Sequence, residues 1–284
     1  MSFGPHPWQQ RHWDWRAACN FMFGGAGAGL IIVTLLIAPP RPPAALFTGL
    51  GLVALGLTAV WLEIGRPLRA LHVMFNPFTS WMTRESFAAL ALFPLAIAAA
   101  IDSAAALAVS AALAALVFAW CQARILQASK GIPAWREPSL GWLVMATALT
   151  EGAAIASLFA AFGAGAGAAR GDGSAPALEG WLALALVARG LAWPLYRQRV
   201  TPGLSRDARS ALEGAGRILM QLGTVVPLAL LAASFAIDAV APAAAALGAL
   251  AALAAGWQFK FVLVTRAAFN QGFALPQLPV RGTR

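Results

Sequence analysis

Charged residues are scarce in this chain. Asp, Glu, Lys and Arg make up only 11% of its 284 residues, whereas 60% are hydrophobic, and the mean hydropathy is +0.72. This composition excludes an ordinary soluble globular domain, because too few polar side chains remain to cover a water-facing surface. No long polar stretch interrupts the apolar runs, so residues 1–284 are interpreted as a single membrane domain.

Cysteine and histidine are almost absent as well. Cys19 and Cys121 both lie in apolar runs and offer neither a disulfide framework nor a metal-binding spacing. A haem held between helices needs at least two histidines within spans. However, His6 and His12 lie in the N-terminal tail, and His72 stands alone. We therefore expect no haem and no metal in this chain.

Long apolar runs recur along the whole chain and predict an all-α, polytopic membrane bundle, because about 18 or more apolar residues suffice for a helix to cross a bilayer. Eight spans are predicted, at about residues 17–38, 44–64, 86–101, 104–124, 140–163, 177–196, 212–236 and 243–265. The third is short, and residues 80–86 are expected to supply its N-terminal end. The first is too long and too rich in glycine for a cleavable signal, so we expect a retained helix.

Basic residues are distributed unevenly between the loops. With eight spans, fifteen of the 20 Lys and Arg residues fall on the side of both termini. The other side holds Arg41 and Arg170, and the remaining three, Arg189, Arg217 and Lys260, lie inside apolar runs. The positive-inside rule therefore predicts a multi-pass protein of the cytoplasmic (inner) membrane with both termini in the cytoplasm. Because the basic residues lie mostly in short loops, the net charge of +9 indicates the lipid bilayer, and no nucleic acid, as a partner.

One connection between spans is unusually rich in ionisable and aromatic residues. Residues 63–85 read EIGRPLRALHVMFNPFTSWMTRE, with two carboxylates, three arginines, one histidine and one tryptophan. Charged groups at the membrane border are costly and mark functional sites. We interpret the 63–85 segment as a cytoplasmic loop that forms the wall of a site for a quinone arriving from the bilayer.

Glu63 and Glu85 flank this segment and are the candidate catalytic residues. Quinone reduction takes two protons as well as two electrons, and a carboxylate can relay those protons. The alternative is that each carboxylate pairs with a neighbouring arginine, Arg66 or Arg84.

Four further residues are candidates for quinone binding. Arg69 could orient a carboxylate or a carbonyl oxygen, and His72 could donate a hydrogen bond or a proton to a quinone carbonyl. Trp81 could stack on the ring, and Asn20, one turn inside the first span, could contact the head group. Their alternatives are an interfacial histidine, an aromatic-belt residue and a polar bridge between helices.

Glycines and buried charges in the spans have structural interpretations. Gly25 and Gly29 have the GxxxG spacing of closely packed membrane helices. Glu151 and Arg189 lie at similar depth, which predicts an ion pair, with a proton path as the alternative. Lys260 lies nearer the cytoplasmic border and is expected to extend its amine to the surface.

Two sequence elements resemble those of a known family. The first reads W-x-x-x-x-N-F-x-x-G-G-x-G-A-G from Trp15. The second reads E-x-G-R-P-x-R-A from Glu63 and is followed by S-W-x-x-R-E at residues 80–85. Together with the eight-span layout, they resemble membrane anchor subunits of the dimethyl sulfoxide reductase type, the DmsC and NrfD-like group. The layout covers most of the chain, whereas the motifs are confined to residues 15–85.

This resemblance implies a heterotrimer. A molybdopterin catalytic subunit would pass electrons through an iron–sulfur subunit to the anchor, both docked on its cytoplasmic face, and quinone would bind nearby. Glu63, Arg69 and Glu85 would be the quinone-site residues. A histidine is common in the family at the position of Glu63, and a carboxylate can serve the same purpose.

Within the family, the tryptophan-rich start and N-P-F-T-S-W-M-T-R-E-S, residues 76–86, are most similar to anchors of phenylacetyl-CoA:acceptor oxidoreductases. Anchors of sulfite dehydrogenases come next. Two other hypotheses stay open: a secondary transporter, suggested by Glu151 and Arg189, and a purely structural anchor without a quinone site.

Overall fold

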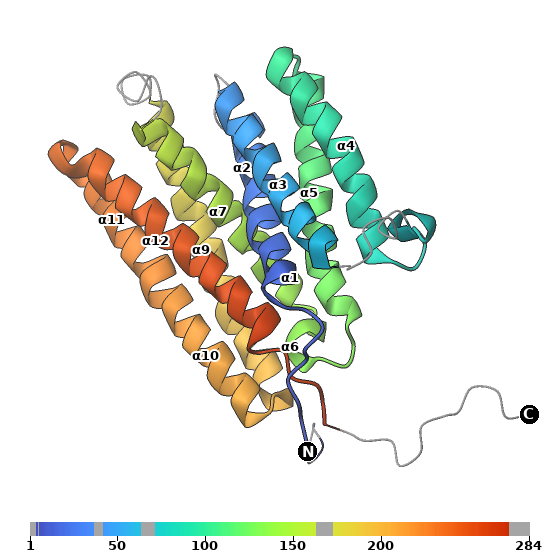
Figure 1. The fold of residues 1–284 in the computed structure, drawn as a ribbon. Coiled ribbons are helices and arrows are strands. Elements are labelled where there is room, and N and C mark those ends of the chain that lie inside the picture. The colour runs from blue at the N-terminus through green and yellow to red at the C-terminus, as the bar shows by residue number, and fades with distance from the viewer. Residues whose placement is uncertain (1–3, 5, 37–41, 64–71, 163–172, 273–284) are drawn as a thin grey trace, which may run out of the picture.

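The computed structural model describes residues 4, 6–36, 42–63, 72–162 and 173–272. Within these residues it contains eight helices that are long and apolar enough to cross a membrane, which confirms the predicted all-α, eight-span layout. Figure 1 shows α4 and α5 at one edge of the bundle, α11 and α12 at the other, and α2 and α7 between them.

The first four spans occupy the N-terminal half. The first comprises α1 (Trp15–Cys19), the π-helix η1 (Asn20–Gly24) and α2 (Gly25–Leu36). It is followed by α3 (Pro43–Glu63), α4 (Trp81–Ile101) and α5 (Ala105–Ala128).

The short helix α6 (Pro133–Arg136) leads into the second four spans. These are α7 (Leu140–Phe162), then α9 (Ser174–Val200) with the 3₁₀ turn η3 (Thr201–Gly203). The seventh span comprises α10 (Arg206–Met220), the π-helix η4 (Gln221–Val225) and α11 (Val226–Ala236). The eighth comprises η5 (Asp238–Val240) and α12 (Ala241–Thr265).

Two helix starts are set by polar caps. Ser80 caps α4 by accepting a 3.3 Å hydrogen bond from the Thr83 amide, so the helix begins at Trp81, which confirms that residues 80–86 supply the start of the third span. Ser205 caps α10 in the same way, from the Ala208 amide, so the seventh span begins at Arg206 rather than near residue 212. In both cases a polar cap extends a helix beyond its apolar run.

The first and fifth spans form the centre of the bundle. Their apolar windows are 78% and 72% buried, against 33–50% for the other six. They cross where Gly29 meets Gly152: a Cβ on Gly29 would lie 2.0 Å from the Ala148 carbonyl oxygen, and one on Gly152 would lie 2.0 Å from the Gly29 carbonyl carbon. The backbones therefore touch directly, which confirms the predicted packing role of the glycine stripe.

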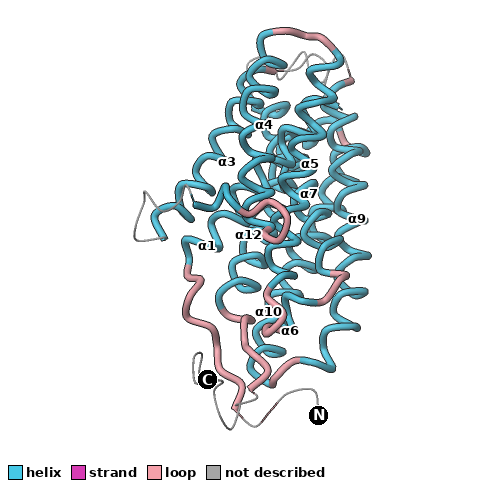
Figure 2. The backbone as a smooth tube through the Cα atoms, turned by 90° about the vertical axis from the view of Figure 1, so that its right-hand side faces the viewer, coloured by secondary structure: helices cyan, strands magenta, loops and turns pink. Residues whose placement is uncertain are grey.

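The described segments near the two termini, residues 6–10 and 268–272, lie side by side at one end of the bundle (Figures 1 and 2). The Gln10 amide donates to the Ala268 carbonyl at 2.8 Å, and the Asn270 amide donates to the Trp8 carbonyl at 3.0 Å. We call this the arginine-rich end, because the loops that carry most of the basic residues lie here.

Helix α6 packs against the ends of α9 and α12 at the arginine-rich end. The Trp135 indole donates a 2.8 Å hydrogen bond to the Leu263 carbonyl and stacks on Trp13, with ring centroids 5.0 Å apart. The Tyr196 hydroxyl donates to the Ala134 carbonyl at 2.6 Å. These buried contacts make a cap over the ends of α9 and α12.

Candidate functional site

The start of α4 is held in place by hydrogen bonds to the turn that precedes it. The Arg84 guanidinium donates to the Pro77 carbonyl at 2.9 Å and to the Phe78 carbonyl at 2.7 Å, and the Thr83 hydroxyl donates to the Val73 carbonyl. Arg84 is therefore committed to backbone carbonyls, and the alternative in which it pairs with Glu85 is wrong.

Glu85 lies inside helix α4, which corrects the prediction that it belongs to a loop. Its side chain is only 5% exposed, and its Oε1 accepts a 3.1 Å hydrogen bond from Nδ2 of Asn20. Asn20 is 4% exposed and begins the π-helix η1 of the first span. Two of the predicted site residues, 65 positions apart in the chain, are thus in direct contact.

Gln122 of α5 completes this cluster. Its Nε2 donates to the Asn20 carbonyl at 2.8 Å, and its amide also interacts with the Glu85 carboxylate. A Cβ on Gly24 would lie 2.4 Å from that Nε2, so the glycine makes room for the amide. The sequence interpretation missed Gln122, although a glutamine within an apolar run is itself a signal. We call Glu85, Asn20 and Gln122 the carboxylate–amide cluster.

One acceptor in the carboxylate–amide cluster has no donor. Asn20 Oδ1 is buried and makes no hydrogen bond among the described residues. A buried polar atom without a partner is costly and indicates a place where water or a ligand binds. It belongs to a π-helical turn, a distortion that is frequent at functional sites.

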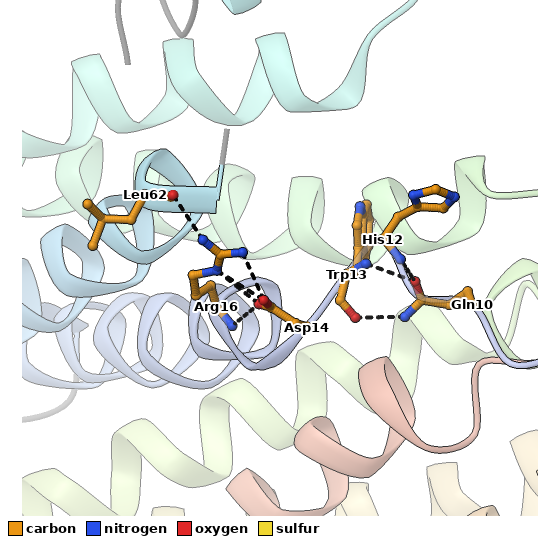
Figure 3. A network of polar contacts seen from close by, with 6 residues as sticks. All are labelled: Gln10, His12, Trp13, Asp14, Arg16 and Leu62. Carbon is orange, nitrogen blue, oxygen red and sulfur yellow. Dashed lines mark hydrogen bonds and ion pairs between the residues drawn. The ribbon is translucent and has the colours of Figure 1, made fainter. Parts of the chain in front are cut away.

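Glu63 is the last residue of α3 and follows Leu62, whose carbonyl belongs to a second polar network (Figure 3). Arg16 Nη1 donates to the Leu62 carbonyl at 3.0 Å, while its Nε and Nη2 hold the Asp14 carboxylate at 3.1 and 2.9 Å. These hydrogen bonds and the adjacent positive charge lower the pKa of Asp14. Glu63 interacts electrostatically with both residues. The sequence interpretation did not identify Arg16 or Asp14 as its neighbours.

The carboxylates of Glu63 and Glu85 thus lie near the same part of the first span. Arg16, near Glu63, and Asn20, bonded to Glu85, are four residues apart, which corresponds to one helical turn, about 6 Å. α3 packs on both α1 and η1, and α4 packs on α3. The predicted grouping of Glu63, Glu85 and Asn20 is therefore compatible with this geometry.

The other predicted binding residues are placed differently. Trp81 is half-buried, and the guanidinium carbons of Arg84 and Arg124 lie 4.2 and 4.9 Å from its ring centroid. Its ring is thus engaged in cation–π contacts of the protein itself. His72 is exposed and lies edge-on to Phe75, with centroids 5.8 Å apart.

Arg69 and the E-x-G-R-P-x-R-A element beyond Glu63 lie outside the described residues, as does any pairing of Glu63 with Arg66. The roles assigned to Arg69, His72 and Trp81 stay predictions.

A buried ion pair lies deeper in the bundle. Lys260 Nζ and Glu151 Oε2 are 2.6 Å apart, and the two residues are 1% and 0% exposed. The predicted ion pair between Glu151 and Arg189 is therefore wrong. The prediction that Lys260 extends its amine to the surface is wrong as well. Arg189 instead donates to the carbonyls of Gly223 and, at 3.2 Å, Ala252. Lys260 is buried although it is near the end of α12, because the cap around Trp135 covers that end.

Glycines bring the ion pair close to the carboxylate–amide cluster. A Cβ on Gly25 would lie 2.5 Å from Lys260 Nζ and 3.3 Å from Gln122 Oε1, so these two polar atoms are at most about 5.8 Å apart. A Cβ on Gly256 would lie 2.6 Å from Glu151 Oε1, an atom that is itself buried without a donor. Polar side chains from α4, η1, α5, α12 and α7 therefore form one internal strip.

No group of three or more His, Cys, Asp or Glu side chains within the described parts of the chain is arranged to hold a metal ion. Comparison with known proteins adds no assignment: no protein-family model matches the chain, and no curated protein matches it significantly. The functional interpretation therefore depends on the motifs of residues 15–85 and on the geometry described above.

Proposed function

We propose that this chain is the membrane anchor and quinone-reactive subunit of a heterotrimeric molybdenum/iron–sulfur oxidoreductase of the DmsC and NrfD-like type. It resides in the cytoplasmic membrane with its arginine-rich end in the cytoplasm. The iron–sulfur subunit docks at that end and exchanges electrons with quinone, and the molybdopterin subunit carries the substrate site. The single observation that carries the proposal is the buried contact between Glu85 and Asn20 at a π-helical turn.

The chemistry of the cluster suits a quinone head group. Quinone takes up two electrons and two protons to become quinol. Protonated Glu85 can donate a proton to a quinone oxygen, and the unpartnered Asn20 Oδ1 can accept a hydrogen bond from the quinol hydroxyl. Glu63, half-buried at the end of α3, can return protons from the aqueous side. In this scheme Arg69, His72 and Trp81 position the head group.

Glu85→Gln tests this role directly. The amide keeps the shape and the contact with Asn20 but cannot donate a carboxylic proton. We expect quinone-linked turnover of the complex to fall by about 100-fold or more, the effect of losing a general acid. Dye-linked activity of the soluble partners should be unchanged. Glu213→Gln, which alters an exposed ion pair with Arg197, is the matched control.

The two activities of Glu85→Gln distinguish a missing proton role from a failure of the complex to assemble. Unchanged quinone turnover in Glu85→Gln would contradict the proton role. Loss of both quinone-linked and dye-linked activity would indicate failed assembly and would favour the purely structural anchor.

Purification in a mild detergent with mass spectrometry tests the assembly itself. Co-purifying molybdopterin and iron–sulfur subunits, together with quinone, are the expected result, and the catalytic subunit would identify the substrate. The resemblance favours phenylacetyl-CoA oxidation, with sulfite oxidation as the alternative.

A secondary transporter is the second candidate, favoured by the buried Glu151–Lys260 pair and by Arg189. Intramembrane ionisable residues often line transport pathways. Transporters of that kind place interrupted helices at corresponding positions of two repeats. Here the π-helical turns η1 and η4 lie in the first and seventh spans, which do not correspond in two four-span halves. A chain that purifies alone, without quinone or redox partners, would favour this alternative.

A further inference from the structure

A groove opens between α10 and α12 at the arginine-rich end of the bundle. Its volume is about 770 Å³, and α10, η4 and α12 supply its lining. The proposed quinone chemistry does not use it. Its lining includes Arg217, Gln221 and Leu222 on one side and Gln258 and Arg266 on the other.

Two arginines and one aspartate line the groove, Arg217, Arg266 and Asp207, so its lining carries a net charge of +1. Both arginines are exposed, and neither takes part in an ion pair among the described residues. They belong to antiparallel helices, and both line the same groove. Asp207 lies about 15 Å before Arg217 along α10, at the same outer end of the groove as Arg266.

Gln258 supplies a second, independent polar feature. Its Oε1 is buried and has no hydrogen-bond donor among the described residues, although the residue lines the groove. A buried acceptor of this kind indicates a place where a water molecule or a ligand can donate a hydrogen bond. A hydroxyl group of a ligand held by the arginines would satisfy it.

Apolar side chains continue from the groove along the seventh span. Ile218, Leu222 and Val225 are 37%, 55% and 58% exposed, and they follow Arg217 by one, five and eight residues. On a helix these positions form a stripe that leads away from the charged border. The surface therefore has cationic side chains at one end and an apolar stripe at the other. This arrangement matches a phospholipid, which has a charged head group and apolar acyl chains.

We propose that the α10–α12 groove binds the head group of an anionic phospholipid that carries a glycerol hydroxyl. Arg217 and Arg266 hold the phosphate through charge-assisted hydrogen bonds. Gln258 Oε1 accepts from the head-group hydroxyl, and an acyl chain lies along Ile218, Leu222 and Val225. Basic pockets between membrane helices are known to bind such head groups. The proposal does not depend on the quinone chemistry.

Native mass spectrometry of the purified chain in detergent tests this site. Phosphatidylglycerol, phosphatidic acid and zwitterionic phosphatidylethanolamine are added at equal concentration. We expect the two anionic lipids to be retained in preference to phosphatidylethanolamine. In R217Q/R266Q, anionic lipid occupancy should fall by about tenfold, given the usual strength of hydrogen bonds between charged groups. R11Q/R199Q changes two exposed arginines outside the groove and should bind as the unmodified chain does.

Gln258→Leu sharpens the test, because phosphatidic acid has the phosphate but no head-group hydroxyl. This variant should lose phosphatidylglycerol while retaining phosphatidic acid. Equal retention of all three lipids, or equal losses in both arginine double variants, would overturn the proposal. Displacement of bound lipid by inorganic phosphate at equal concentration would show a general anion site and would also overturn it.

Discussion

At the scale of single residues, the Lys260–Glu151 pair places two opposite charges where water does not reach them. Two charges without access to water must compensate each other, and neither side chain is more than 1% exposed. Arg189 adds a further positive charge nearby, which interacts electrostatically with both members of the pair. Removing one partner leaves the other charge buried and unpaired, and that penalty exceeds the value of the pair itself.

Lys260→Met should therefore destabilise the protein by about 3–5 kcal/mol. The neutral double variant E151Q/K260M should regain part of that loss, because no uncompensated charge remains. Unfolding in detergent, followed by tryptophan fluorescence, measures both. Arg197→Gln, which breaks the 3.4 Å exposed pair with Glu213, is the control and should cost less than about 1 kcal/mol. A double variant no more stable than Lys260→Met would contradict this account.

Residue chemistry was only partly predictable from the sequence. Polar residues in apolar runs marked Asn20 and Glu151 as important, and the charged segment 63–85 marked Glu85. The structure brings Asn20 and Glu85 together. The sequence pattern did not identify the partners of these residues, because the depth of a residue along a helix does not show which face of the helix its side chain occupies. Lys260 is the example: its depth suggested the surface, while its face is directed at Glu151.

At the scale of helices, the crossing of the first and fifth spans determines how the two halves of the bundle meet. Gly29 and Gly152 allow the two backbones to touch, and Gly25 makes room for Lys260 Nζ one turn away. The same crossing therefore provides both close packing and the space that the ion pair occupies. Because the blocking atoms at the crossing are backbone, they cannot move aside as a flexible side chain would.

Gly29→Ala and Gly152→Ala should each separate the helices and destabilise the protein, by about 1–3 kcal/mol or more. The yield of monodisperse protein and its thermal midpoint in detergent measure this effect. Gly51→Ala is the matched control, because a Cβ there has no neighbour within 4 Å, and it should be neutral. Equal effects at Gly29 and Gly51 would mean that the crossing tolerates added volume.

Helix number and approximate position could be predicted from apolar runs, but some details could not. Residues 80–86 were expected at the start of the third span, but the exact start of α4 at Trp81 depends on the Ser80 cap, and the burial of Glu85 depends on packing. The π-helical turns at Asn20–Gly24 and Gln221–Val225 leave no mark in hydropathy. Such turns are decided by packing, which a pattern of apolar residues does not contain.

At the scale of the whole molecule, the distribution of charge predicts which end of the bundle faces the cytoplasm. Both terminal segments lie at the arginine-rich end, where hydrogen bonds between Gln10 and Ala268 and between Trp8 and Asn270 join them. An even number of spans agrees with this placement. The prediction of this orientation depends on the positive-inside rule alone. The orientation determines whether redox partners can dock from the cytoplasm.

Cysteine labelling in cells tests this orientation. Cys19 and Cys121 are first replaced by alanine, and single cysteines are then introduced at Arg199, on the arginine-rich side, and at Ser103, between α4 and α5 on the opposite side. A membrane-impermeant maleimide should label Ser103→Cys in intact spheroplasts and Arg199→Cys only after permeabilisation. The reverse pattern would place the arginine-rich end outside the cytoplasm. Partners docked at that end would then have to be exported proteins, and this result would contradict the proposed cytoplasmic oxidation.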